Sequence, residues 1–88
     1  MVTQLVQIMN PTGLDVKPAG ILCKEAVKFK CKVTYHYGSG NIANAKSVLS
    51  VLGSSIKYGE EIQLECDGED EEAALAHLVA CVKNGLDD

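Results

Sequence analysis

The chain has 88 residues, of which 47% are hydrophobic and 23% are charged, and its formal net charge at pH 7 is −4. A chain of this length predicts one domain, residues 1–88, that buries only about 60–65% of its unfolded surface, so a functional site is expected at the surface and no enclosed cofactor is expected. The basic residues are all lysines, and the acidic balance argues against nucleic-acid binding, which depends on a basic face.

The N-terminal segment and the cysteines indicate the compartment. Residues 1–9 have no basic n-region and are predicted to form a strand rather than a secretion signal. No apolar stretch approaches the ~20 residues that a membrane span requires, so we expect a cytoplasmic protein. The cysteines at positions 23, 31, 66 and 81 form no CxxC pair, and we expect reduced thiols that pack as small hydrophobes, with no metal site.

The first third of the chain predicts a strand followed by a helix. Residues 2–8 alternate in polarity, as expected for a strand. Residues 10–13, Asn-Pro-Thr-Gly, indicate a turn. Apolar residues then recur at helical spacing from Val16 to Lys28, and Pro18 falls in the first turn, where its missing N–H costs little.

The middle of the chain predicts a hairpin and a short helix. Cys31–Tyr37 reads as a strand, and Gly38-Ser39-Gly40 is typical of a hairpin turn. A short strand at Asn41–Asn44 completes the hairpin. Ser47 to Leu52 carries an apolar stripe that indicates a short helix.

The last third predicts a strand and a final helix. Glu60–Cys66 alternates polar and apolar residues, and Asp67-Gly68 turns the chain. A helix follows at Asp70–Lys83, with acidic residues in its first turn that suit the helix dipole. The element order is β-α-β-β-α-β-α, which predicts an α+β fold with a four-stranded, mostly antiparallel sheet and three helices on one face.

Two motifs carry a resemblance to a known family. Residues 10–19, NPTGLDVKPA, are similar to the motif N-x-x-G-[LI]-H-A-R-P-A of HPr phosphocarrier proteins. Residues 46–49, KSVL, resemble the second motif of that family, K-S-I-M, and residues 60–73 resemble its last strand and the start of its last helix. The resemblance covers Val2 to about Asn84 and implies the HPr-like open-faced sandwich.

The resemblance implies a role in the phosphoenolpyruvate-dependent sugar phosphotransferase system of bacteria. In the family, the motif histidine takes phosphate from Enzyme I and passes it to sugar permeases, and the neighbouring arginine binds the phosphoryl oxygens. The match places Asp15 at the position of the histidine and Lys17 at that of the arginine. Both reactive residues therefore differ, while the residues that shape the motif remain.

Three interpretations of Asp15 stay open. Aspartate is among the best N-cap residues, so Asp15 could simply cap the helix. Its charge of about −1 could mimic a phosphorylated carrier and bias partner binding. Its carboxylate could also accept phosphate as an acyl phosphate, although such sites usually hold a divalent cation.

The second motif suggests regulation. In HPr proteins of low-GC Gram-positive bacteria its serine is phosphorylated by a dedicated kinase, and the match assigns that role to Ser47, which could otherwise be only an N-cap. Catabolite-repression HPr-like proteins also lack the histidine and act as co-regulators of a transcription factor. The residues expected to contact partners are Leu14, Gly20, Ile21, Lys24, Val48, Leu49 and Leu52.

Taken together, the motifs predict a regulatory, protein-binding member of the family that is not an enzyme, controlled at Ser47. The alternative is a working phosphocarrier that uses an acyl phosphate on Asp15. The expected partners are proteins: Enzyme I, sugar permease components, and an HPr kinase or a transcriptional regulator. No cofactor, nucleic acid or membrane insertion is expected.

Overall fold

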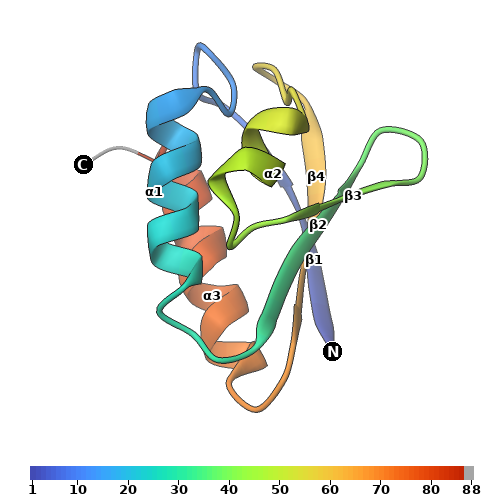
Figure 1. Ribbon diagram of the computed structural model, residues 1–88, viewed down its shortest axis with the longest axis vertical. Coiled ribbons are helices and arrows are strands. Elements are labelled where there is room, and N and C mark those ends of the chain that lie inside the picture. Colours follow the sequence, from blue (N-terminus) through green and yellow to red (C-terminus); the bar gives the residue numbers. More distant parts are fainter. Residues whose placement is uncertain (87–88) are drawn as a thin grey trace.

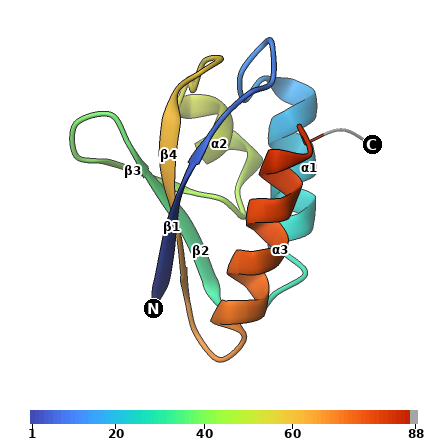
Figure 2. The same ribbon diagram turned by 180° about the vertical axis from the view of Figure 1, so that it is seen from behind.

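The computed structural model describes residues 1–86, which form two layers, a sheet and a set of helices (Figures 1 and 2). The elements follow the predicted order, and their bounds are β1 (Val2–Gln7), α1 (Val16–Ala26), β2 (Lys32–Tyr37), β3 (Asn41–Asn44), α2 (Val48–Gly53), β4 (Glu61–Asp67) and α3 (Glu71–Lys83). The α+β class and the placement of the helices on one side of the sheet are confirmed.

The sheet has the strand order β1-β4-β2-β3, and every neighbouring pair is antiparallel. The last strand in sequence, β4, lies between β1 and β2, pairing Val6 with Ile62 on one side and Tyr35 with Leu64 on the other. The chain therefore returns from α2 into the centre of the sheet. Exposed and buried residues alternate along β4 because helices cover only one face of the sheet.

The helices occupy different parts of that covered face. Helix α3 packs against β1 and β4, α2 packs beside β3, and α1 packs against both other helices. The core between the layers consists of aliphatic side chains and one aromatic ring. Its largest fully buried side chains are Tyr35, Ile8, Leu22, Ile62, Leu64, Leu78, Leu86, Val33, Val51, Val82 and Cys66.

Several predicted boundaries shift by one residue, and one helix is shorter than expected. Helix α1 ends at Ala26 rather than Lys28, with Val27 as its C-cap, so Phe29 packs from the following loop. All four cysteines are free thiols; Cys31 and Cys66 are buried, whereas Cys23 and Cys81 are half-buried. No helix within residues 1–86 is long and apolar enough to cross a membrane.

Candidate functional site

The loop that leads into α1 is fixed by a glycine with a left-handed backbone. Gly13 has φ of +69°, and its N–H donates to the carbonyl of Asn10 at 2.8 Å. The next residue, Leu14, donates its N–H to the carbonyl of Ile56 at 2.9 Å. A Cβ on Gly13 would lie 2.1 Å from that same carbonyl oxygen. Only glycine allows the loop to lie this close to the segment that follows α2.

Asp15 begins helix α1 through its backbone and not through its side chain. It is the N-cap residue, with extended φ and ψ of −82° and −172°, and its carbonyl accepts from the Ala19 N–H at 2.8 Å. Of the three interpretations left open, the helix cap therefore holds for the position of Asp15 but not for its side chain, because the carboxylate makes no capping hydrogen bond. Pro18, at the third helical position, has no N–H to donate and so removes one of the two usual partners of an N-cap side chain, whereas the Lys17 N–H at the second position remains.

The Asp15 carboxylate is consequently displayed to solvent. Asp15 and Lys17 are both exposed, and the ion pairs found among residues 1–86 do not include one between them. Val16, between them, is 69% exposed. The start of α1 therefore presents a carboxylate, an apolar side chain and an ammonium group on one small surface.

Ser47 is the N-cap of α2, as the sequence allowed. Its Oγ accepts from the Ser50 N–H at 3.2 Å, and its side chain is half-buried. The preceding residue, Lys46, holds this turn against the end of α1. Its ammonium donates to the carbonyl of Phe29 at 2.6 Å, and its carbonyl accepts from the Cys23 thiol at 3.1 Å. These two hydrogen bonds of Lys46 hold the turn that contains Ser47 against α1 and the loop after it.

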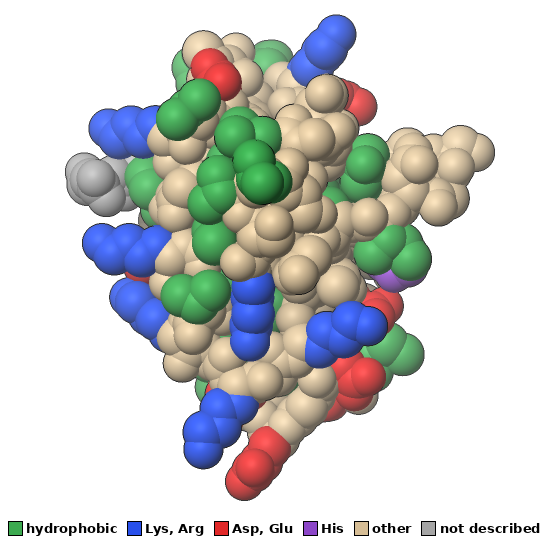
Figure 3. All heavy atoms as spheres, viewed as in Figure 1, with side chains coloured by type: hydrophobic (Ala, Val, Ile, Leu, Met, Phe, Trp, Pro, Cys, Tyr) green, Lys and Arg blue, Asp and Glu red, His purple; other side chains and the backbone are tan. Residues whose placement is uncertain are grey.

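The expected partner surface is exposed in part. On α2, Leu49 is 83% and Val48 is 38% exposed, whereas Leu52 is half-buried against the core. On α1, Gly20 and Ile21 are half-buried and Lys24 is exposed. Figure 3 shows hydrophobic side chains gathered over α1 and α2, with lysines around them.

Leu14 corrects one expectation about that surface. We expected Leu14 to contact partners, but it is only 3% exposed and belongs to the core cluster. The backbone of Leu14 is also hydrogen-bonded to Ile56, and its side chain packs in the core and is not offered to a partner.

Asp15 and Ser47 lie at opposite ends of α2. Ser47 begins this helix, and the loop of Asp15 is hydrogen-bonded to the segment after it, at Ile56. Six helical residues span only about 9 Å. One protein partner bound over the exposed side chains of α2 could therefore reach both Asp15 and Ser47.

Comparison with known proteins defines the class to which this fold and site belong. The family model for the HPr component phosphorylation site of the phosphotransferase system matches residues 2–84. The chain belongs to the HPr family of phosphocarrier proteins of the phosphotransferase system, as the two motifs predicted.

Individual relatives agree with this assignment. The chain is 38% identical over 76 residues to the phosphocarrier protein HPr of Mycoplasma genitalium, with 86% of each chain covered. It is 36% identical over 83 residues to the HPr-like protein Crh of Bacillus subtilis, covering 94% of this chain and 96% of that one. Among solved structures, HPr-C-His from Thermoanaerobacter tengcongensis superposes with a TM-score of 0.92 at 28% identity, covering 98% and 96% of the two chains.

Proposed function

We propose that this chain is a regulatory, protein-binding member of the HPr family that carries no phosphate at Asp15 and is controlled by phosphorylation at Ser47. One observation carries the proposal: the Asp15 carboxylate is exposed and makes no capping hydrogen bond. By the motif match, Asp15 stands where the family has its phosphate-accepting histidine. The surrounding loop keeps its shape through Gly13, so the change affects the reactive group and leaves its support intact.

The chemistry of a carboxylate at this position favours a display role over phosphate transfer. An acyl phosphate places further negative charge on an already charged carboxylate, and such sites usually use a bound cation to offset it. Within residues 1–86, Asp15 belongs to no group of side chains that could hold a metal ion. A solvent-facing carboxylate instead presents a constant negative charge, smaller than that of a phosphoryl group.

The surroundings of Ser47 suit control by phosphorylation. A phosphoryl group adds about −1.5 to −2 charges at neutral pH. At Ser47 this charge would stand next to Val48 and Leu49, which are exposed, and would change the partner that this apolar surface accepts. We expect the partners to be an HPr kinase and a transcriptional regulator, with Enzyme I and sugar permease components as further candidates.

The alternative function is a phosphocarrier that uses Asp15. One observation favours it: the carboxylate has no capping hydrogen bond that would have to break before it reacts. In that case Lys17 would offset part of the charge of the acyl phosphate, although it lacks the forked donors of arginine.

Labelling by HPr kinase and ATP tests the regulatory role. We expect phosphate on the native chain and none on Ser47→Ala. Ser39→Ala, in the exposed β2–β3 turn, is the matched control and should label like the native chain. A native chain that stays unlabelled, or equal label on Ser47→Ala, would overturn control at Ser47.

A second assay, with Enzyme I and phosphoenolpyruvate, tests the carrier role. We expect no label on the native chain and label on Asp15→His, because the loop that supports the position is intact. A stable, hydroxylamine-sensitive label on the native chain would establish the acyl phosphate and refute the non-carrier role. Asp15→His that accepts no phosphate would show that more than the histidine has been lost.

A further inference from the structure

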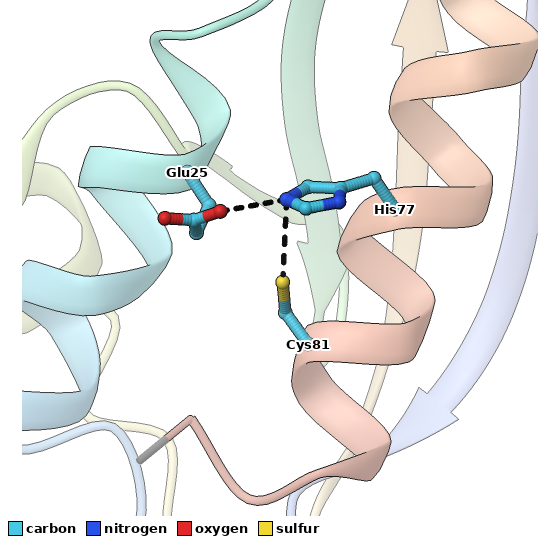
Figure 4. A group of neighbouring side chains, drawn as sticks. All are labelled: Glu25, His77 and Cys81. Atoms are coloured by element: carbon cyan, nitrogen blue, oxygen red, sulfur yellow. Dashed lines mark hydrogen bonds and ion pairs between the residues drawn. The ribbon is translucent and has the colours of Figure 1, made fainter. Parts of the chain in front are cut away.

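Three side chains with metal-binding atoms meet on the surface between α1 and α3, away from both motifs (Figure 4). Nε2 of His77 lies 2.6 Å from Oε1 of Glu25 and 3.6 Å from Sγ of Cys81. The ligand atoms of all three lie within 4.8 Å of one another. The HPr-type functions discussed above use none of these residues.

The helices explain why the three side chains converge. His77 and Cys81 are four residues apart on α3 and therefore project from the same face, one turn apart. Glu25 comes from the last turns of α1, which packs beside α3. The ring of Phe29 lies beside the His77 ring, with centroids 5.5 Å apart and planes at 53°. The cluster is thus assembled by tertiary packing.

We propose that Glu25, His77 and Cys81 bind a divalent transition-metal ion, with Zn²⁺ as the best fit, between α1 and α3. Zinc accepts thiolate, imidazole and carboxylate ligands in one tetrahedral site, whereas Mg²⁺ and Ca²⁺ prefer oxygen ligands alone. Three protein ligands leave a fourth position for water. Because the His77 side chain is 42% exposed, that position is open to solvent.

One of the three distances between ligand atoms already matches a zinc site, and a second needs a small change. With Zn–S of about 2.3 Å and Zn–N of about 2.05 Å, tetrahedral sulfur and nitrogen ligands lie about 3.6 Å apart. The distance between Cys81 Sγ and His77 Nε2 has this value already. The Glu25 oxygen must retreat from 2.6 Å to about 3.3 Å from Nε2, which a rotation of its long side chain allows.

Protons and charges can be balanced with the residues present. Hydrogen bonds from His77 and Lys28 lower the pKa of Glu25, so this ligand is charged before the metal arrives. In the hydrogen bond to Glu25 the proton is on Nε2, so metal binding requires the neutral imidazole to exchange this proton through solvent onto Nδ1, which frees Nε2 as the ligand. The Cys81 thiol, whose pKa is raised by burial, gives its proton to solvent when the metal binds. The Lys28 ammonium, 2.9 Å from Glu25 Oε1, has a half-exposed side chain that can move into water.

Calorimetric titration of the untagged, reduced protein with zinc chloride tests the site. We expect about one ion per chain. Cys81→Ser and His77→Gln should each weaken zinc binding by at least about 10-fold, because losing even a residue that only supports a ligand costs that much metal affinity. Titration with Co²⁺ should give a thiolate-to-cobalt charge-transfer band that Cys81→Ser abolishes. Zinc should also raise the melting temperature of the native chain, because it bridges two helices.

Two matched variants control for general effects. Cys23→Ser removes another half-buried thiol, and His36→Gln removes the other histidine, which pairs with Glu65 at 3.2 Å but has no neighbouring cysteine. Both should leave zinc affinity unchanged. If the native chain binds no zinc, if it binds without a thiolate band, or if the controls lose as much affinity as the site variants, the cluster is only a hydrogen-bonded ion pair and the proposal fails.

Discussion

At the scale of single residues, two small features determine what the first motif can do. Pro18 removes one of the two helix N–H groups from which an N-cap carboxylate can accept, and the Asp15 carboxylate is exposed without a capping hydrogen bond. Gly13 supplies the left-handed turn and the close approach to Ile56 that hold the loop in place. The side chain of Asp15 is therefore open to solvent, while the loop that leads to it is held by backbone contacts.

Gly13→Ala should strongly destabilise the protein. The side chain must adopt a left-handed φ and must also displace the Ile56 carbonyl, which together cost about 2–4 kcal/mol. Gly40→Ala is the matched control, because Gly40 has φ of +82° but open space around it, and should cost only about 1 kcal/mol. Urea unfolding of both variants measures the difference. Equal losses would mean that the loop does not lie against Ile56.

At the scale of elements, helix α1 contains a glycine, Gly20, that lowers its stability and that no close contact requires. Gly20 lies inside the helix, and a Cβ there would meet nothing within 4 Å. The sequence expects Gly20 in the partner surface, where a missing side chain permits close approach. Close approach of a partner to α1 would explain why a glycine, which weakens a helix, stands at this open position.

Gly20→Ala should therefore separate stability from binding. We expect it to raise the free energy of unfolding by up to about 1 kcal/mol, because alanine has the higher helix propensity. Affinity for a protein partner should fall at the same time, which a binding titration against HPr kinase would detect. Unchanged affinity would remove Gly20 from the partner surface, and a loss of stability would contradict the open space around it.

A buried hydroxyl pair joins the sheet to α2. Tyr35 on β2 lies with its hydroxyl 2.6 Å from Ser54 Oγ, and Ser54 in turn donates to the carbonyl of Val51 at 2.6 Å. Burial raises the pKa of Tyr35, so the phenol stays protonated and can donate. This short chain of donors fixes the end of α2, just before the segment that holds the Asp15 loop.

Tyr35→Phe should cost about 1 kcal/mol of unfolding free energy, the usual net value of a hydrogen bond, since the ring remains in the core. Tyr58→Phe is the control, because Tyr58 is 57% exposed and should tolerate the change. Chemical denaturation of the two variants gives the comparison. A neutral Tyr35→Phe would show that the hydroxyl pair adds no stability.

At the scale of the whole molecule, one carboxylate connects segments that are far apart in the chain. Asp70 stands before α3, but its two oxygens accept from the N–H groups of Lys30 and Cys31 at 2.8 and 2.9 Å. These groups belong to the connection between α1 and β2. The sequence predicted Asp70 inside the last helix as a partner of the helix dipole, whereas the structure uses it as the N-cap residue that fastens another loop.

This contact predicts a pH dependence of stability. The pKa of Asp70 lies below its ordinary value of 3.8 because its carboxylate accepts from the backbone N–H of Lys30 and from that of Cys31. A lowered folded-state pKa gives stability that is present above the unfolded value and is lost as the pH falls through the folded value. Asp70→Asn should therefore be less stable than the native chain at pH 7, and this difference should shrink as the pH is lowered below about 4. Glu69→Gln, next to it, should keep the native profile; an Asp70→Asn profile parallel to the native one would contradict the role of the carboxylate.

The sequence by itself determined the family, the element order and the α+β class, because hydrophobic periodicity and two spaced motifs are local properties of the chain. It also placed Ser47 at a helix start, since N-capping depends on neighbouring residues. The same local reasoning allowed Asp15 as an N-cap but could not tell whether its side chain takes part, and it failed for Leu14, which is buried in the core.

Only the tertiary structure brought Glu25 to His77, 52 residues further along the chain. The sequence could show that His77 and Cys81 share a helix face, but without a CxxC pair it predicted no metal site. The third ligand depends on how α1 packs against α3, which no spacing in the sequence encodes. Contacts between distant segments are set by the packing of the whole core, and for that reason they decided the buried leucine and the three-residue cluster.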